Sequence, residues 1–171
     1  MECIPLLDIC CKIATIVIAA VNVGFVIYFF YKKSRNDNAD KEKDRKISWL
    51  KTLILDNSFK YFYTFFDELQ ANLELLKAEG LDDDQKKNID TASEDLFITL
   101  RRRFIDGLLA IDDNLYSSIL KSCDELQEQL TDAIFDPGIK LSHIPKFNEQ
   151  IVERLTVAKT AIIKQLFNYR G

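Results

Sequence analysis

The chain has 171 residues, enough for one domain of ordinary size and an appended segment, and it contains only five Gly and three Pro. An all-β fold needs turn residues about every 8 to 12 positions, so this supply argues against it and predicts an all-α protein. Residues 47–171 hold 15 Lys/Arg and 21 Asp/Glu, a net charge of −6. We therefore expect no nucleic acid among the partners, because a phosphate-binding surface needs a positive field.

The start of the chain predicts a single transmembrane helix at residues 13–31, preceded by a short extracytoplasmic segment at residues 1–12. The nineteen residues of the expected span carry no charge. As a helix they would cover about 28 Å, close to the hydrocarbon thickness of a bilayer. Basic residues follow directly, so the positive-inside rule predicts a cell (inner or plasma) membrane protein with its N-terminus outside and its body in the cytoplasm. These residues are Lys32, Lys33 and Arg35.

A cleaved signal peptide is the alternative interpretation of this segment. Signal peptides carry their basic residues before the apolar run and small residues at the cleavage site. Here the basic residues come after the run, and bulky residues stand where the cleavage site would be. An uncleaved anchor fits this order better.

The expected span also carries residues typical of helix–helix association. A central amide such as Asn22 is unfavourable alone in hydrocarbon and often bonds to another helix. Thr15 and Ala19 share its face, whereas Ala20 and Gly24 form a small-xxx-small pair on another face. Self-association is one interpretation; the other is that any span tolerates one Asn and a few small residues.

Residues 32–46 predict a charged, solvated linker, since the only apolar residue from position 34 to 46 is Ala39. Residues 47–171 then predict an elongated cytoplasmic bundle of about three long helices. In the first of them, apolar residues recur at threes and fours. Gly80 is expected to end this helix, and Asp82 to cap the next one.

The aromatic stretch at residues 59–66 gives the first helix an apolar face too wide for one neighbour. Two explanations remain open. The helix packs between two others of its own bundle, or it presents Tyr61 and Phe65 to a partner protein.

The second helix keeps one apolar phase from Phe97 to Ile134. That phase favours one helix of about forty residues or more over two shorter helices. The stretch at residues 136–138, Asp-Pro-Gly, is expected to end it, and Pro145 to lie in the first turn of the last helix.

Three consecutive arginines, Arg101, Arg102 and Arg103, form the only dense basic patch of the body. The helical phase places Arg101 towards the core, where a guanidinium needs an acidic partner. The acids of the first helix that could form this pair are Asp67, Glu68 and Glu74. The alternative is that all three arginines contact an anion.

No residue set predicts catalysis, a metal site or a cofactor. His143 is the only histidine, no Cys-x-x-Cys pair occurs, and the lone Cys123 of the body suits a reducing compartment. The aspartates of the second helix lack the histidines of a bundle di-metal site, so we expect them to lie on solvated helix faces or in the first turn of a helix. They are Asp106, Asp112 and Asp113.

We therefore expect a non-enzyme: a membrane-anchored helical interaction protein that serves as anchor, adaptor or assembly subunit. Its expected partners are the bilayer and either another protein or a second copy of itself. The alternative is a membrane-perturbing effector, of the toxin or anti-phage defence type, that oligomerises through its transmembrane helix.

Overall fold

A computed structural model describes residues 21–33 and 40–171 of the chain, and these residues form helices and connections with no strand among them. The all-α prediction is confirmed for this part of the chain. The chain divides into two compact units, Met1–Asp44 and Arg45–Gly171.

In the first unit, residues 21–33 form one helix whose side chains are all exposed. Its large apolar side chains, from Val21 to Tyr31, are 51–76% exposed. Within the described ranges, no helix combines the length and the apolar character needed to cross a membrane. Residues 1–20, which include the first part of the expected span, and residues 34–39 of the expected linker lie outside the described residues.

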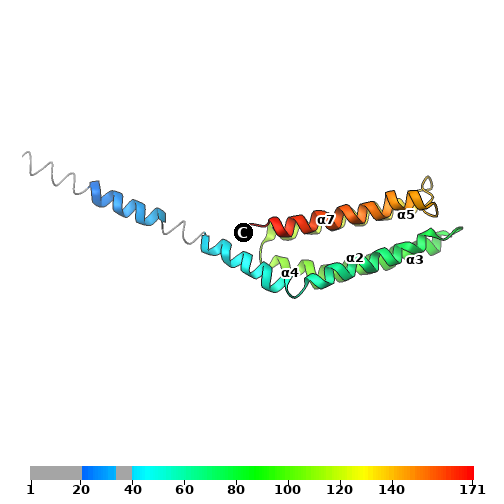
Figure 1. The fold of residues 1–171 in the computed structure, drawn as a ribbon, viewed down its shortest axis with the longest axis horizontal. Coiled ribbons are helices and arrows are strands. Elements are labelled where there is room, and N and C mark those ends of the chain that lie inside the picture. Colours follow the sequence, from blue (N-terminus) through cyan, green and yellow to red (C-terminus); the bar gives the residue numbers. More distant parts are fainter. Residues whose placement is uncertain (1–20, 34–39) are drawn as a thin grey trace, which may run out of the picture. The chain divides into compact units, whose positions relative to one another are not determined.

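The second unit contains four long helices, namely α2 (Phe59–Leu73), α3 (Asp83–Leu100), α5 (Asp113–Phe135) and α7 (Glu153–Asn168). They lie side by side in a bundle (Figure 1). Successive helices are antiparallel and pack in chain order, α2 on α3, α3 on α5, and α5 on α7. A helix over residues 40–49 leads into this unit. The elements that follow are η1 (Leu50–Leu55), α2 (Phe59–Leu73), η2 (Glu74–Lys77), α3 (Asp83–Leu100), η3 (Arg101–Ile105), α4 (Asp106–Leu109), α5 (Asp113–Phe135), α6 (Ile144–Phe147), η4 (Asn148–Val152) and α7 (Glu153–Asn168).

The expectation of one long second helix is wrong, and the bundle therefore has four long helices where about three were expected. The helical path ends after Leu109, and α5 starts afresh at Asp113. Asp112 lies between them with an extended backbone (φ −162°, ψ 124°) and caps α5 by accepting the N–H groups of Asn114 and Leu115. The apolar phase survives the turn because Ile111, 4% exposed, faces the same core as the helices on both sides. Periodicity alone could not detect this break.

The other predicted helix boundaries are confirmed. Gly80 has a φ of +74°, a conformation that glycine adopts without strain, and it follows the end of η2. The carboxylate of Asp82 accepts the N–H of Gln85 at 2.7 Å, and the Gln85 side chain accepts the N–H of Asp82 at 3.0 Å. This reciprocal capping box starts α3. Pro145 lies in the first turn of α6.

One continuous apolar core fills the bundle. The inner stripes predicted for the first and last helices are buried, including Phe62 at 0% and Phe147 at 0% exposed. Phe104, from the turn between α3 and α4, lies 5.5 Å from Phe62 between ring centroids. The bundle core thus draws on every long helix.

Candidate functional surfaces

The residues expected to mediate helix association fall only partly within the described chain. Asn22 and Gly24 lie on the exposed helix at residues 21–33. Nothing lies within 4 Å of the position that a Cβ atom on Gly24 would take, so its face is open. Thr15, Ala19 and Ala20 lie outside the described residues.

Of the two explanations for the wide aromatic face, packing within the bundle holds at Phe65, and its side chain does not face a partner protein. Its side chain is 4% exposed. Its ring lies 5.0 Å from that of Phe66 and 5.0 Å from that of Phe97 on α3. Tyr61 is half-buried, with the Arg103 guanidinium 5.3 Å from its ring centre. Helix α3 thus covers this side of the aromatic stretch within the bundle.

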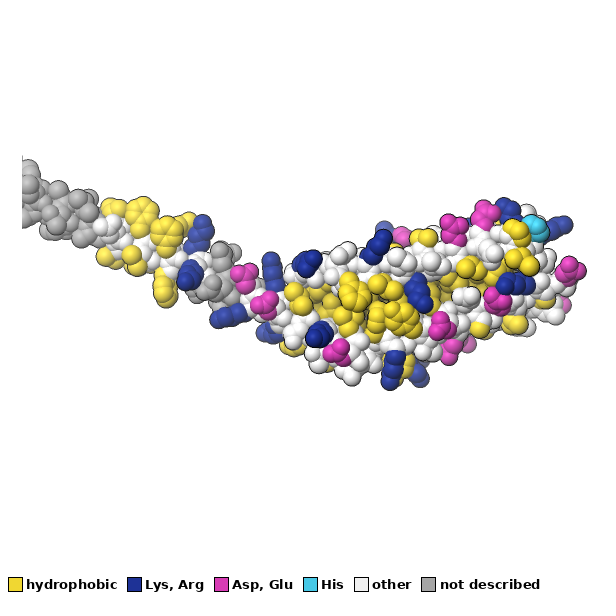
Figure 2. Space-filling view, in the orientation of Figure 1, with side chains coloured by type: hydrophobic (Ala, Val, Ile, Leu, Met, Phe, Trp, Pro, Cys, Tyr) yellow, Lys and Arg dark blue, Asp and Glu magenta, His cyan; other side chains and the backbone are white. Residues whose placement is uncertain are grey.

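The other side of the aromatic stretch faces α7. Figure 2 shows apolar side chains gathered along the seam between these two helices. The Phe59 ring lies 6.4 Å from that of Phe167, and the Lys159 ammonium lies 4.9 Å from the centre of the Tyr63 ring. Phe167 is 62% and Tyr63 43% exposed, so the seam leaves aromatic surface open to solvent. The width of the aromatic face is explained mainly by two neighbouring helices of the same bundle.

The three arginines do not converge on one site. Arg101 was expected to point inward to an acid on the first helix, and this is wrong. Its side chain is 54% exposed, pairs with Asp106 at 3.5 Å and donates to the Tyr116 hydroxyl at 3.3 Å. The Tyr116 hydroxyl, and after it Asp106, raise the pKa of Arg101. Arg103 lies over Tyr61 instead, and Arg102 is exposed.

A π-helical turn explains why the α-helical period predicts the wrong side of the helix for Arg101. Residues Arg101–Ile105 form η3, which holds more residues per turn than an α-helix. The expected rotation of 100° per residue does not hold across it. Phe104 and Ile105 are consequently both buried at 1% exposed, and Arg101 is left at the rim.

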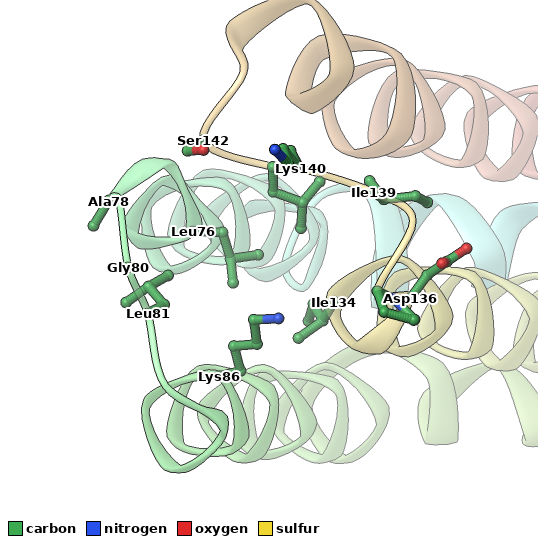
Figure 3. Close-up of a pocket in the computed structure, with 12 residues that line it drawn as sticks. Leu76, Ala78, Gly80, Leu81, Lys86, Ile134, Asp136, Ile139, Lys140 and Ser142 are labelled. Carbon is green, nitrogen blue, oxygen red and sulfur yellow. The ribbon is translucent and has the colours of Figure 1, made fainter.

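A pocket of about 210 Å³ lies at the end of the bundle, between the α2–α3 connection and the α5–α6 connection (Figure 3). Leu76 and Ile134 contribute apolar walls, and Lys86 and Lys140 extend along it. Aspartates at residues 82–84 begin α3 close by, so the lysines do not create a strongly positive site.

A second groove, of about 360 Å³, lies between α5 and α7. Its floor is made by Leu126 and by the small side chains Ala158 and Ala161, while Val157 stands at its edge, 61% exposed. An apolar floor with a polar rim is the usual anatomy of a protein interface. The rim carboxylates are Glu125, Glu149 and Glu153.

Side-chain hydrogen bonds hold the two helices together beside this groove. The Ser118 hydroxyl donates to Gln165 at 2.9 Å, and Gln165 donates to Ser122 at 3.0 Å. Further along, the Arg154 guanidinium donates to the Gln129 carbonyl at 2.6 Å. These bonds join α5 to α7 on either side of the alanines, so the groove is a built feature of the helix pair.

One surface was missed by the sequence reasoning: the outer face of residues 45–55. Arg45, Trp49 and Leu53 recur every four residues and so share one side of a helix. Trp49 is 41% and Leu53 49% exposed, and the Arg45 guanidinium lies 5.0 Å from the centre of the Trp49 ring. The i, i+4 spacing of these residues, next to the buried pair Leu50 and Ile54, was the available signal.

Asp112 joins this segment to the rest of the bundle. Its carboxylate pairs with the Lys46 ammonium at 2.9 Å while it caps α5. The Lys46 hydrogen bond is the largest cause that lowers the pKa of Asp112, with smaller contributions from the Leu115 N–H and the Tyr169 hydroxyl. Asp112 is therefore neither solvated nor simply a first-turn acid: it caps α5 and pairs with Lys46.

No group of three or more potential ligands is placed to hold a metal ion within residues 21–33 and 40–171. No family model matches the chain, and no curated protein or solved structure matches it. Fold and surfaces define its class: an all-α protein with a four-helix unit and, before it, a helix of exposed apolar residues.

Proposed function

We propose that the chain is a single-pass membrane-anchored interaction protein whose four-helix unit recruits or assembles a partner protein at the cytoplasmic side of the cell membrane. The observation that carries this proposal is the helix at residues 21–33. From Val21 to Tyr31 its large apolar side chains are more than half exposed, and such a helix is unfavourable in water. A bilayer is the environment that an uncharged run from Ile13 to Tyr31 matches in length.

The cytoplasmic placement of the bundle follows from the charges beside this helix. Lys32 and Lys33 end the described helix, and Arg35 comes two positions later. Clustered basic residues next to a span stay on the cytoplasmic side. The four-helix unit after them then lies in the cytoplasm.

The α5–α7 groove supports a binding role for the four-helix unit. Its apolar floor and the exposed Val157 would accept apolar side chains of a partner helix. Its rim is polar, with Glu149 paired to Lys146 at 2.9 Å and Glu125 to Lys121 at 3.7 Å. We propose action by binding, since the charged residues singled out in the sequence, Arg101 and Asp112, make structural pairs.

Carbonate extraction of membranes from cells that produce the chain tests the anchor. We expect the intact chain to stay in the membrane pellet, and a version that lacks residues 1–31 to move to the supernatant. Release of the intact chain by carbonate would contradict the anchor.

A photo-cross-linking residue at position 157 tests the groove in the same membranes. We expect a cross-linked product of higher mass at position 157 and none at Glu94, an exposed position on α3 that serves as the matched control. The same products at both positions, or none at position 157, would contradict a partner in the groove.

The membrane-perturbing effector remains the second candidate, and the open face beside Gly24 favours it. A glycine on a lipid-facing helix lets another helix approach closely, and Asn22 can bond across such a contact. Depolarisation of cells on overproduction, lost in both Gly24→Leu and Asn22→Leu, would support this role. An unchanged membrane potential would leave the interaction role as the better proposal.

A further inference from the structure

The outer side of α7 carries fewer charges than that of its neighbour α5. From Glu153 to Asn168 only two of the exposed residues are charged, Glu153 and Lys164. The exposed residues between these two are Thr156, Val157 and Thr160. The exposed charged residues of α5, by contrast, are Asp113, Lys121, Asp124, Glu125, Glu128 and Asp132. Depletion of charge at the centre of a surface is the compositional signal of a protein interface.

The two charges on this side have opposite signs and lie at its two ends. Glu153 and Lys164 are eleven residues apart, which is three helical turns, so they point the same way about 16 Å from each other. Neither forms an ion pair within the described residues. Each is therefore available to a partner of the opposite sign.

The other charges beside this side of α7 have interactions within the chain. At the rim of the α5–α7 groove, Glu149 pairs with Lys146 at 2.9 Å and Glu125 with Lys121 at 3.7 Å. Two further cations turn to neighbouring helices; they are Arg154, on the Gln129 carbonyl of α5, and Lys159, over the Tyr63 ring of α2. The charges left for a partner are thus those at positions 153 and 164.

A second copy of the same helix matches this charge pattern when the two helices are antiparallel. Glu153 of each copy then lies opposite Lys164 of the other, which gives two ion pairs and no contact between like charges. A parallel arrangement in register would place each charge opposite its own kind. The pattern therefore favours an antiparallel, symmetric pair.

The shape of the surface agrees with this register. Pairing position 153 with position 164 also places Val157 opposite Thr160 of the other copy, because both pairs are centred on the same point of α7. Val157, 61% exposed, then lies beside the groove of the other copy, which has a volume of about 360 Å³. The groove floor on α7 consists of Ala158 and Ala161, and such small side chains let a second helix approach closely.

We propose that the partner bound at the α5–α7 groove is a second copy of this chain, held through antiparallel α7 helices. Each copy places Val157 at the groove of the other, and an ion pair between Glu153 and Lys164 closes each end of the contact. The inference rests on the proposed function, because it names the partner that the four-helix unit assembles.

Cross-linking between two differently tagged copies of the full chain tests this pairing in membranes. The copies are produced in the same cells, and one of them carries a photo-cross-linking residue at position 157. We expect a product of twice the 19.8 kDa mass of the chain that carries both tags.

Charge reversal tests the register and the symmetry of the pair. Glu153→Lys or Lys164→Glu, present in both copies, puts like charges at both contacts and should lower the yield of this product by about tenfold. The two changes together in each copy should restore the yield. A Glu153→Lys copy produced with a Lys164→Glu copy should restore it as well, because every contact again joins opposite charges. Glu94→Lys and Lys87→Glu make the same changes at exposed positions of α3 and should leave the yield unchanged.

The remaining outcomes separate this inference from the proposed function. A product at position 157 that contains a different protein would overturn the second copy and leave the proposed function standing. A doubly tagged product whose yield ignores the charges at 153 and 164, or does not recover in the combined variants, would also overturn the α7 pair. No product at position 157 would overturn both the pair and a partner in the groove. Release of the chain by carbonate, with the charge-dependent product retained, would overturn the anchor alone.

Discussion

Replacing Asp112 by alanine should destabilise the four-helix unit by about 1.5–3 kcal/mol. Loss of an N-cap costs about 0.5–2 kcal/mol, and the carboxylate accepts two N–H groups of α5 at 3.0 and 3.1 Å. The pair with Lys46 adds about 1 kcal/mol, because the two side chains are only 14% and 28% exposed. Asp112→Asn should cost about 1 kcal/mol, since asparagine caps as well as aspartate but cannot form the ion pair.

Urea unfolding of residues 45–171, followed by far-ultraviolet circular dichroism, measures these differences. Asp113→Ala is the matched control; it removes an exposed acid from the first turn and should cost at most about 0.5 kcal/mol. The sign of the Asp112→Ala effect decides between two folds. In one uninterrupted helix from α3 to α5, alanine would replace a poor helix former and stabilise the unit by about 0.5 kcal/mol. A stabilised Asp112→Ala variant would therefore refute the helix break.

The stability that Asp112 provides should also depend on pH. Its pKa is lowered in the folded state, chiefly by Lys46, so the folded unit favours the ionised form. The contribution is complete above the unfolded pKa of about 3.9 and is lost as the pH falls through the lower folded pKa. The difference between the wild-type chain and Asp112→Asn should thus shrink in urea titrations at acid pH.

Three further variants and one thiol reaction test the packing of the bundle. Phe65→Ala should cost about 3–5 kcal/mol in the same assay because the ring is buried against α3, whereas Tyr63→Ala should cost clearly less because its side chain is 43% exposed. Arg101→Ala should leave the urea midpoint within error of the wild type, and a large drop would contradict its exposed position. Burial raises the pKa of Cys123 to about 12, so a disulfide reagent at pH 8 should react with the folded unit only as fast as it unfolds; immediate reaction would show that the thiol is accessible.

The features that the sequence predicts well depend on local chemistry. The turn at Gly80 depends only on the positive φ of that residue. The cap at Asp82 depends only on Gln85, three residues later, and Pro145 fits the first turn of any helix, where its missing N–H is not required. The inner stripes of the first and last helices follow from periodicity, which each helix shows by itself. These elements are visible without knowledge of how the helices are arranged.

The features that the sequence reasoning missed depend on how helices meet. A helix reversal at Asp112 keeps the apolar phase, because both helices face one core. An apolar face as wide as the one around Phe65 is compatible with a partner or with a second helix of the same chain, and only the packing on Phe97 distinguishes them. The exposure of Trp49 was missed for the same reason, because it depends on which side of its helix the bundle covers.

The π turns have a consequence for how the length of this chain can vary. Each of them, at Leu50–Leu55, Arg101–Ile105 and Asn148–Val152, holds a residue in excess of α-helical geometry. A deletion there returns the turn to regular helix and leaves the faces before and after it aligned with the core. A deletion elsewhere in a long helix rotates everything beyond it by about 100° and exposes the apolar stripe. Single-residue gaps among homologous chains should therefore collect at these three turns.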